Sequence, residues 1–224
     1  MPTVPGVPTV PTCRIVLIAK APLAGYCKTR LIPALGPDGA AALAAQMLRH
    51  VAQTAVDAQV GPVEICAAPT AIHPLWHTLR LPAQLAWTEQ GEGDLGQRMA
   101  RAAGRTLARG ETVLLIGSDC PALTVSHLRN AAHATQRGAA ALIPACDGGY
   151  VLLGMPRMLP ALFADMPWST PDVARITLER MAAARMPVQV GDALHDVDEP
   201  SDLAFLPPGF LAPKPLNAPI KHVS

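Results

Sequence analysis

The chain has 224 residues, of which half are hydrophobic and 16% are charged. This composition supplies enough apolar surface for a sizeable core and excludes a wholly disordered chain. The formal net charge is +1, so the basic excess that binds duplex nucleic acid is missing and we expect no nucleic-acid partner. No apolar run approaches the roughly 18 residues of a membrane-spanning helix. We therefore expect a soluble, cytoplasmic protein without a membrane span.

Proline occupies every third position near the start of the chain, which favours an extended, polyproline-like arm over residues 1–11. Residues 207–224 are also rich in proline and lack periodicity. We expect both segments to be flexible tails on one domain, residues 12–206. The five cysteines form no Cys-x-x-Cys pair, which favours free thiols over disulfides or a zinc site.

Short apolar runs alternate with longer helical patterns along this domain. In the first half we expect, in chain order, a strand at 13–19, a helix at 36–59, strands at 63–68 and 84–90, and a helix from 94 to 110. In the second half we expect a strand at 112–121, a helix at 125–137 and strands at 140–145 and 150–154. A helix at 169–186 with a Ser/Thr cap and a strand at 188–190 follow. This alternation is typical of a three-layer α/β domain with a mostly parallel sheet. Ligands bind such sheets outside the carboxyl ends of the strands.

The first polar cluster directly follows the first expected strand, in the segment AKAPLAGYCKTRL. It combines a flexible glycine, a hydroxyl and three cations, which are Lys20, Gly25, Lys28, Thr29 and Arg30. Such a loop can hold a nucleotide di- or triphosphate through its cations and backbone N–H groups. It is neither a Walker loop nor a dinucleotide fingerprint. The alternative is a solvated basic loop.

The second cluster, GSDCP, ends the clearest central strand. A carboxylate directly after a buried strand is held at the sheet edge where ligands lie, so we expect Asp119 to bind Mg²⁺ or Mn²⁺. Ser118 beside it is a candidate phosphate ligand. The alternative is that Asp119 caps the following helix, a role that Thr124 or Ser126 can also fill.

The third cluster, DVDEPSDL, follows the last expected strand and is the densest acidic segment of the chain. It contains Asp196, Asp198, Glu199 and Asp202. Carboxylates that converge with Asp119 would build a metal site lacking only the phosphate oxygens of a substrate. The alternative is that Asp198 caps the short helix that Pro200 begins.

Two further segments have weaker patterns. In GEGDLGQRM, Arg98 either forms an i,i+4 surface pair with Asp94 or points into a nucleotide cleft. In DGGYVLLG, Gly148 and Gly149 either allow a sugar or base to approach the backbone closely or form a tight hairpin turn.

Six segments together, AKAPLAGYCKTRL, GEGDLGQRM, GSDCPAL, DGGYVLLG, PWSTPDV and DVDEPSDL, resemble a bacterial family of glycosyltransferase-like proteins. This family has the nucleotide-diphospho-sugar transferase fold, is often encoded beside radical-SAM genes and is in part linked to arsenosugar biosynthesis. The resemblance spans about residues 12–206. The KTRL element is also distantly similar to molybdenum-cofactor and phospholactate guanylyltransferases. Two departures are Cys146, where the family usually has an acidic residue, and Glu199, where it often has threonine.

The resemblance implies a three-layer, Rossmann-like sandwich of the A-type glycosyltransferase fold that binds a nucleotide or nucleotide sugar. By this analogy Lys20, Lys28 and Arg30 face phosphates. Asp119 takes the place of the metal-binding aspartate of the fold, and Asp198 supplies the second carboxylate.

We accordingly expect a Mg²⁺- or Mn²⁺-dependent glycosyltransferase with a nucleotide-diphosphate sugar donor and a small-molecule acceptor. The expected catalytic residues are Asp119, Asp147 and Asp198, of which Asp147 is the best available base. Sugar and acceptor contacts are expected from Gly148, Gly149, Tyr150, Trp168 and Ser169.

Two other functions stay open. One is a nucleotidyltransferase that uses GTP, CTP or UTP, with Lys28 and Arg30 at the pyrophosphate leaving group. The other is a non-catalytic nucleotide-binding protein. The sequence leaves the base, the sugar, the acceptor, the stereochemistry and the oligomeric state open.

Overall fold

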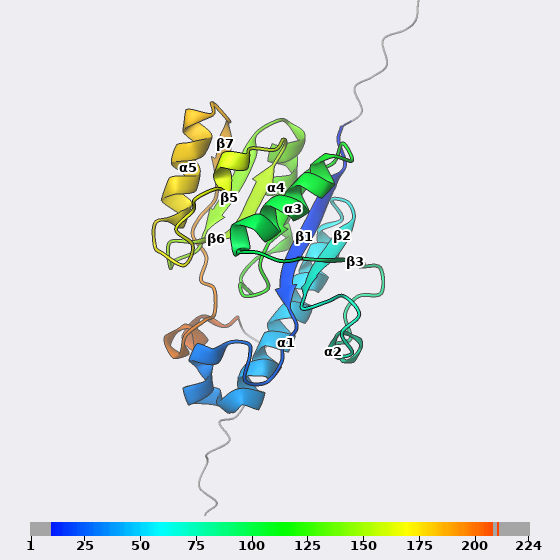
Figure 1. Cartoon of the computed structure of the whole chain (residues 1–224), viewed down its shortest axis with the longest axis vertical. Helices are drawn as coiled ribbons and strands as arrows, with labels where there is room; N and C mark the ends of the chain where they lie inside the picture. Colours follow the sequence, from blue (N-terminus) through cyan, green and yellow to red (C-terminus); the bar gives the residue numbers. More distant parts are fainter. Residues whose placement is uncertain (1–9, 208–209, 211–224) are drawn as a thin grey trace, which may run out of the picture.

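A mixed seven-stranded sheet forms the centre of the structure, a computed structural model that describes residues 10–207 and residue 210 (Figure 1). The strands follow the order β3-β2-β1-β4-β6-β5-β7. Their bounds are β1 Cys13–Lys20, β2 Val63–Ala68, β3 Ala86–Glu89, β4 Thr112–Ile116, β5 Ala140–Pro144, β6 Tyr150–Met155 and β7 Val188–Val190. The expected tails, 1–11 and 207–224, lie almost entirely outside the described residues.

The sheet is mostly parallel, as predicted. β1 pairs in parallel with β2 and β4, β2 with β3, and β5 with β7. β6 alone runs in the opposite direction and pairs with β4 and β5. The carboxyl ends of β1 and β4 and the beginning of β6 therefore meet at one edge of the sheet.

Helices cover both faces of the sheet, which confirms the predicted three-layer α/β class (Figure 1). Helices α1 (Ile32–Ala58) and α4 (Val125–Gln136) pack on one face, and α3 (Leu95–Leu107) and α5 (Val173–Ala183) on the other. Both faces of the central strands are apolar and buried, which is why these strands read as continuous hydrophobic runs. In β1, Ile15 and Leu17 face the α1 side and Val16 faces the α3 side.

Several predicted boundaries differ from the structure, and three of these differences have a clear physical reason. The strand predicted at 112–121 ends at Ile116, because the polar residues after it leave the sheet. The helix expected to begin at Gly36 begins four residues earlier, at Ile32. Gly36 then interrupts α1 with a φ of 71°, a conformation that suits glycine. The predicted Ser/Thr cap of α5 is wrong. This helix begins after Asp172, and Ser169 lies before it with a φ of 65°.

A small third core anchors the acidic segment after β7. Val197 is fully buried against Leu31, Leu43 and Met47 from the beginning of α1 and the short helix η1 (Thr29–Leu31). In an extended segment, neighbouring side chains point to opposite sides. Burial of Val197 therefore turns the residues on either side of it, Asp196 and Asp198, away from this core. Within the described residues, no helix is long and apolar enough to cross a membrane.

A buried ionic network lies at the opposite end of the sheet. Glu64 on β2 is 1% exposed and pairs with Arg14 of β1 at 3.7 Å and with Arg105 of α3. The Thr88 hydroxyl donates to the same carboxylate at 2.6 Å. Arg14 also donates to Glu111 at 2.6 Å. This network links three adjacent strands to one helix through charges that have left water.

We predict that Glu64→Gln lowers the free energy of unfolding by about 3 kcal/mol, because it leaves the guanidinium groups without their buried counter-charge. The exposed pair of Glu179 with Arg175 supplies the control, since Glu179→Gln should cost about 0.5 kcal/mol or less. Urea denaturation measures both values. Equal losses in the two variants would contradict a structural role for the buried network.

Candidate functional site

A pocket of about 810 Å³ opens at the sheet edge where β1 and β4 end and β6 begins. Its lining includes residues from every motif singled out in the sequence. The lining residues used below are Lys20, Lys28, Thr29, Arg30, Gln90, Arg98, Ser118, Asp119, Asp147, Gly149, Tyr150, Trp168, Ser169, Asp196 and Asp198. This is the edge at which parallel α/β sheets bind ligands.

A buried ammonium group joins the two expected metal ligands. Lys28 Nζ lies 3.0 Å from Asp119 Oδ2 and 3.2 Å from Asp198 Oδ1. The Lys28 side chain is only 6% exposed, whereas the two aspartates are about half exposed to the pocket. Their negative charges raise the pKa of Lys28, although burial opposes this shift. The two carboxylates, 79 residues apart (198 − 119) in the chain, thus converge on one cation.

Local backbone geometry explains this convergence. Lys28 precedes η1 in the left-handed region, with a φ of 47°, which turns its side chain inward from the loop. The backbone N–H of Val197 donates to the carbonyl of Asp119 at 2.8 Å and ties the acidic segment to the end of β4. Asp202 accepts from the N–H of Asp198 at 3.0 Å.

Both proposed capping roles for these aspartates are wrong. Thr124 caps α4 and accepts from the N–H of His127. Glu199, not Asp198, caps the short helix η3 (Pro200–Phe205), and it forms a capping box with Asp202. Asp119 and Asp198 are therefore not needed as helix caps, and both face the pocket.

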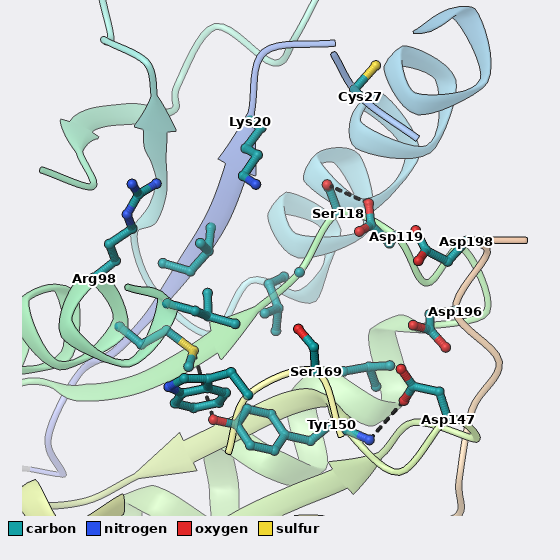
Figure 2. A pocket seen from close by; sticks show the side chains of 18 of the residues that line it. Lys20, Cys27, Arg98, Ser118, Asp119, Asp147, Tyr150, Ser169, Asp196 and Asp198 are labelled. Carbon is teal, nitrogen blue, oxygen red and sulfur yellow. Dashed lines mark hydrogen bonds between the residues drawn. The ribbon is translucent and has the colours of Figure 1, made fainter. Parts of the chain in front are cut away.

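A second carboxylate pair lies beside the first. Figure 2 shows Asp196 and Asp147 facing one another below Asp119 and Asp198. Burial, and then the charge of Asp147, raises the pKa of Asp196 to about 6. Asp147 Oδ1 accepts from the N–H of Gly149 at 2.8 Å. Negative charge therefore exceeds local positive charge on this side of the pocket.

The turn between β5 and β6 holds Asp147 in place. Gly148 has a φ of 93°, and a Cβ at this position would lie 2.1 Å from the carbonyl oxygen of Pro171. Its carbonyl accepts from the N–H of Ala174 at the start of α5 at 2.9 Å. The glycine pair thus forms the tight hairpin turn that the sequence allowed. Gly149 lines the pocket, whereas Gly148 and Gly25 do not.

Aromatic side chains form the opposite part of the lining. Tyr150 and Trp168 pack edge to face with ring centroids 6.5 Å apart, and the Tyr150 hydroxyl contacts Met99 Sδ at 3.9 Å. Burial raises the pKa of Tyr150, so its hydroxyl stays protonated. Ser169, next to Trp168, points into the cavity (Figure 2) from a left-handed backbone that a serine rarely adopts.

Arg98 lies across the cavity from the aspartates, near Lys20 (Figure 2). Its guanidinium donates to the carbonyl of Gly93 at 2.9 Å and to Gln90 Oε1 at 3.3 Å. Of the two predicted alternatives, Arg98 therefore takes the position in the pocket and does not form the surface pair with the Asp94 side chain. The Gln90 amide in turn donates to Ala19 and Cys66 carbonyls at 2.9 and 3.0 Å. Gln90 therefore fixes Arg98 to the ends of β1 and β2.

Gln90 lines the pocket but was not predicted as a site residue, and Asp196 was named in the acidic cluster without a role of its own. Gln90 is the polar residue that ends the expected strand 84–90, and polar residues after strands are the pattern that identified Asp119. Asp196 lies two residues before Asp198 in an extended segment, a spacing that places both side chains on one side.

The residues present fit a divalent cation of the Mg²⁺ or Mn²⁺ type. Aspartate oxygens are the hard donors that these ions prefer, and Asp147 and Asp196 add negative charge that the neighbouring cations do not balance. In the part of the chain that the structure describes, no three His, Cys, Asp or Glu side chains gather into a metal site. A cation here would complete its coordination with substrate oxygens or water.

The fold is that of the nucleotide-diphospho-sugar transferases. A protein of Desulfovibrio desulfuricans G20 that bears the provisional name nucleotide-diphospho-sugar transferase is 32% identical, with a TM-score of 0.77, 84% of this chain covered and 83% of that chain. The chain belongs to the family DUF2064, described as an uncharacterized protein conserved in bacteria, which matches residues 44–170.

More distant structures share only the fold. A 4-diphosphocytidyl-2C-methyl-D-erythritol synthase of Anaerococcus prevotii is 8% identical with a TM-score of 0.56, and the match covers 88% of this chain and 94% of that one. A CMP:2-keto-3-deoxy-manno-octonic acid synthetase complexed with CTP is 11% identical with a TM-score of 0.53, over 87% and 96%. No curated protein matches the sequence. The expected link to arsenosugar biosynthesis stays a prediction.

We predict that Asp196→Asn raises the melting temperature above that of the wild type near neutral pH. The folded protein holds the pKa of Asp196 at about 6, above its ordinary value of 3.8. The folded state therefore binds more protons than the unfolded state between these values, and stability falls as pH rises through this window. Asparagine removes this cost, so the difference from the wild type should shrink towards about pH 4.

Thermal unfolding measured from about pH 4 to about pH 8 tests this pH dependence. Asp192→Asn is the control, because Asp192 is an exposed carboxylate in the same connection after β7 and its replacement should leave the pH profile unchanged. A stability difference for Asp196→Asn that does not vary with pH would contradict the assignment.

Proposed function

We propose that the protein is a transferase that binds a nucleotide-diphosphate sugar and transfers the sugar to a small-molecule acceptor, with Mg²⁺ or Mn²⁺ as its cation. One observation carries this proposal: Asp119 and Asp198 converge on Lys28 in a pocket that also contains Arg98 and the aromatic pair of Tyr150 and Trp168. The similarity to the Desulfovibrio desulfuricans protein, which is 32% identical, supports it.

The charged part of the pocket suits a diphosphate. Lys20, Lys28, Arg30 and Arg98 supply donors for phosphate oxygens, and Asp119 and Asp198 would hold the divalent cation. When bound, the cation would stabilise the negative charge that develops on the departing nucleoside diphosphate. Lys28 and Arg30 would add to this stabilisation by donating to the phosphate oxygens of the leaving group.

The aromatic part of the pocket suits a sugar and an acceptor. Tyr150 and Trp168 present apolar ring surface, against which a sugar ring can pack, and the Gly149 backbone permits close approach. Ser169 supplies a hydroxyl that points into the cavity. Asp147 and Asp196 are the carboxylates best placed to accept the proton of an acceptor hydroxyl.

Nucleotidyl transfer is the second candidate function. The four basic side chains that line the pocket offer enough donors for the three phosphates of a nucleoside triphosphate. In this reaction a substrate phosphate would attack the α-phosphorus of GTP, CTP or UTP, and Lys28 and Arg30 would bind the departing pyrophosphate.

The released product distinguishes the two reactions. The protein is incubated with Mg²⁺ or Mn²⁺ and each candidate donor, after a thermal-shift screen has selected those that raise the melting temperature. Release of a nucleoside diphosphate from a nucleotide sugar supports glycosyl transfer, whereas release of pyrophosphate from a nucleoside triphosphate supports nucleotidyl transfer. A protein that binds donors but releases neither product would be a nucleotide-binding protein.

We predict that Asp119→Asn lowers turnover by about 100-fold or more, because it removes charge that holds the cation against the leaving group. Product release under saturating donor measures the effect. Asp192→Asn, with a carboxylate outside the pocket lining, should retain wild-type turnover. Unchanged turnover in the folded Asp119→Asn protein would contradict the proposed role of this residue.

A further inference from the structure

Every oxygen of the two central carboxylates already faces a hydrogen-bond donor. Asp119 Oδ2 and Asp198 Oδ1 face Lys28 Nζ. Asp119 Oδ1 accepts from the Ser118 hydroxyl at 3.0 Å, and Asp198 Oδ2 lies 3.2 Å from Arg30 Nη1. A divalent cation that bridges both carboxylates would have to come close to Lys28 Nζ, which lies between them and repels it by like charge.

Lys28 is the donor that matters most, because it alone contacts both carboxylates. Its ammonium is buried, so solvent screens its attraction to the half-exposed aspartates less than it screens a pair in which both groups are exposed. Arg30 contacts Asp198 and Glu199 but is 64% exposed, which makes its attraction weak. The Ser118 hydroxyl can rotate away without leaving a buried charge.

We propose that Lys28 acts as an internal counter-ion that excludes a free divalent cation from Asp119 and Asp198, so that the site takes up the cation together with the diphosphate of its donor. This inference rests on the proposed function. The ligand is then the complex of the cation with the diphosphate. The free cation does not bind first and the donor second.

The diphosphate supplies what Lys28 needs in order to move. A buried ammonium that lost both aspartates without a new partner would carry a large desolvation cost. Lys28 lines the pocket, where phosphate oxygens can replace the carboxylate oxygens as its acceptors. The aspartates are then free for the cation. Transfer of Lys28 to the phosphates and binding of the cation by the aspartates are each unfavourable alone. When both occur together, every charge keeps a partner of opposite sign.

Mn²⁺ binding to the free protein tests this inference without any measure of turnover. Electron paramagnetic resonance follows free Mn²⁺ during titration of the wild type, Lys28→Met and Arg30→Met. We expect Lys28→Met to bind Mn²⁺ about tenfold or more tightly than the wild type, because it removes the competing charge. Arg30→Met should change the affinity much less. Inorganic pyrophosphate binds Mn²⁺ itself, so the same titration without protein is the reference. Above this reference, pyrophosphate should bring the Mn²⁺ uptake of the wild type close to that of Lys28→Met.

Circular dichroism shows whether each variant is folded. If Lys28→Met does not fold, Lys28→Gln replaces it in the Mn²⁺ titration. Lys28→Met should also gain more thermal stability from Mn²⁺ than the wild type does, because its carboxylates repel one another until a cation binds. The double variant Lys28→Met with Asp119→Asn should lose the tight Mn²⁺ binding.

Equal Mn²⁺ affinity of free wild type and free Lys28→Met would overturn the inference and leave the proposed function standing. Tighter binding by Lys28→Met in a protein that releases no nucleoside diphosphate from any donor would support the inference and overturn the proposed function. Mn²⁺ binding by no variant, even with pyrophosphate, would overturn both.

Discussion

The ion pairs of Lys28 with Asp119 and Asp198 are the constraint on which the site depends. They join three segments that are far apart in the chain: the loop after β1, the end of β4 and the connection after β7. A buried ammonium is stable only while its counter-charges are in place. The folded protein therefore cannot keep Lys28 buried without also bringing the two carboxylates together.

The reversed strand β6 determines what faces this ionic centre. Because β6 runs antiparallel to β4, its first residue, Tyr150, lies at the same edge as the end of β4. The β5–β6 turn then brings Asp147 towards Asp196. In a fully parallel sheet β6 would begin at the opposite end, and Tyr150 would lie away from the loop after β1. The mixed topology thus brings the beginning of β6, with the aromatic part of the pocket, to the edge where Asp147 lies.

Much of the fold was predictable because buried strands and amphipathic helices leave local patterns. The strand at β1 and the helix at α4 follow from runs of apolar residues, and Asp119 was found because a polar residue that follows a buried strand lies at the ligand-binding edge. The inward position of Lys28 was not predictable. A lysine in a glycine-containing loop resembles a solvated cation, and its burial depends on Asp198, 170 residues further along the chain.

The cap of α5 shows the opposite failure, in which a local pattern was clear but misleading. Ser169 and Thr170 precede the helix as good caps do, yet the Thr170 hydroxyl donates to the Pro167 carbonyl at 2.8 Å and Ser169 takes a left-handed backbone. A cap requires an extended backbone directly before the helix. The segment instead places Trp168 against Tyr150, so its conformation follows the demands of the pocket rather than those of the helix.

The pocket is divided into parts that differ in the physical interaction they offer. Lys28, Asp119 and Asp198 offer paired charges held by the fold, whereas Tyr150 and Trp168 offer apolar ring surface. A ligand that is charged at one end and carries a ring at the other satisfies both parts at once, and a purely ionic or purely apolar ligand leaves one of them unsatisfied. The nucleotide-diphosphate sugar meets this requirement because its phosphates and its sugar are separate groups joined by one bond. Glycosyl transfer, the proposed reaction, would break that bond, and the bond would lie where the two parts of the pocket meet.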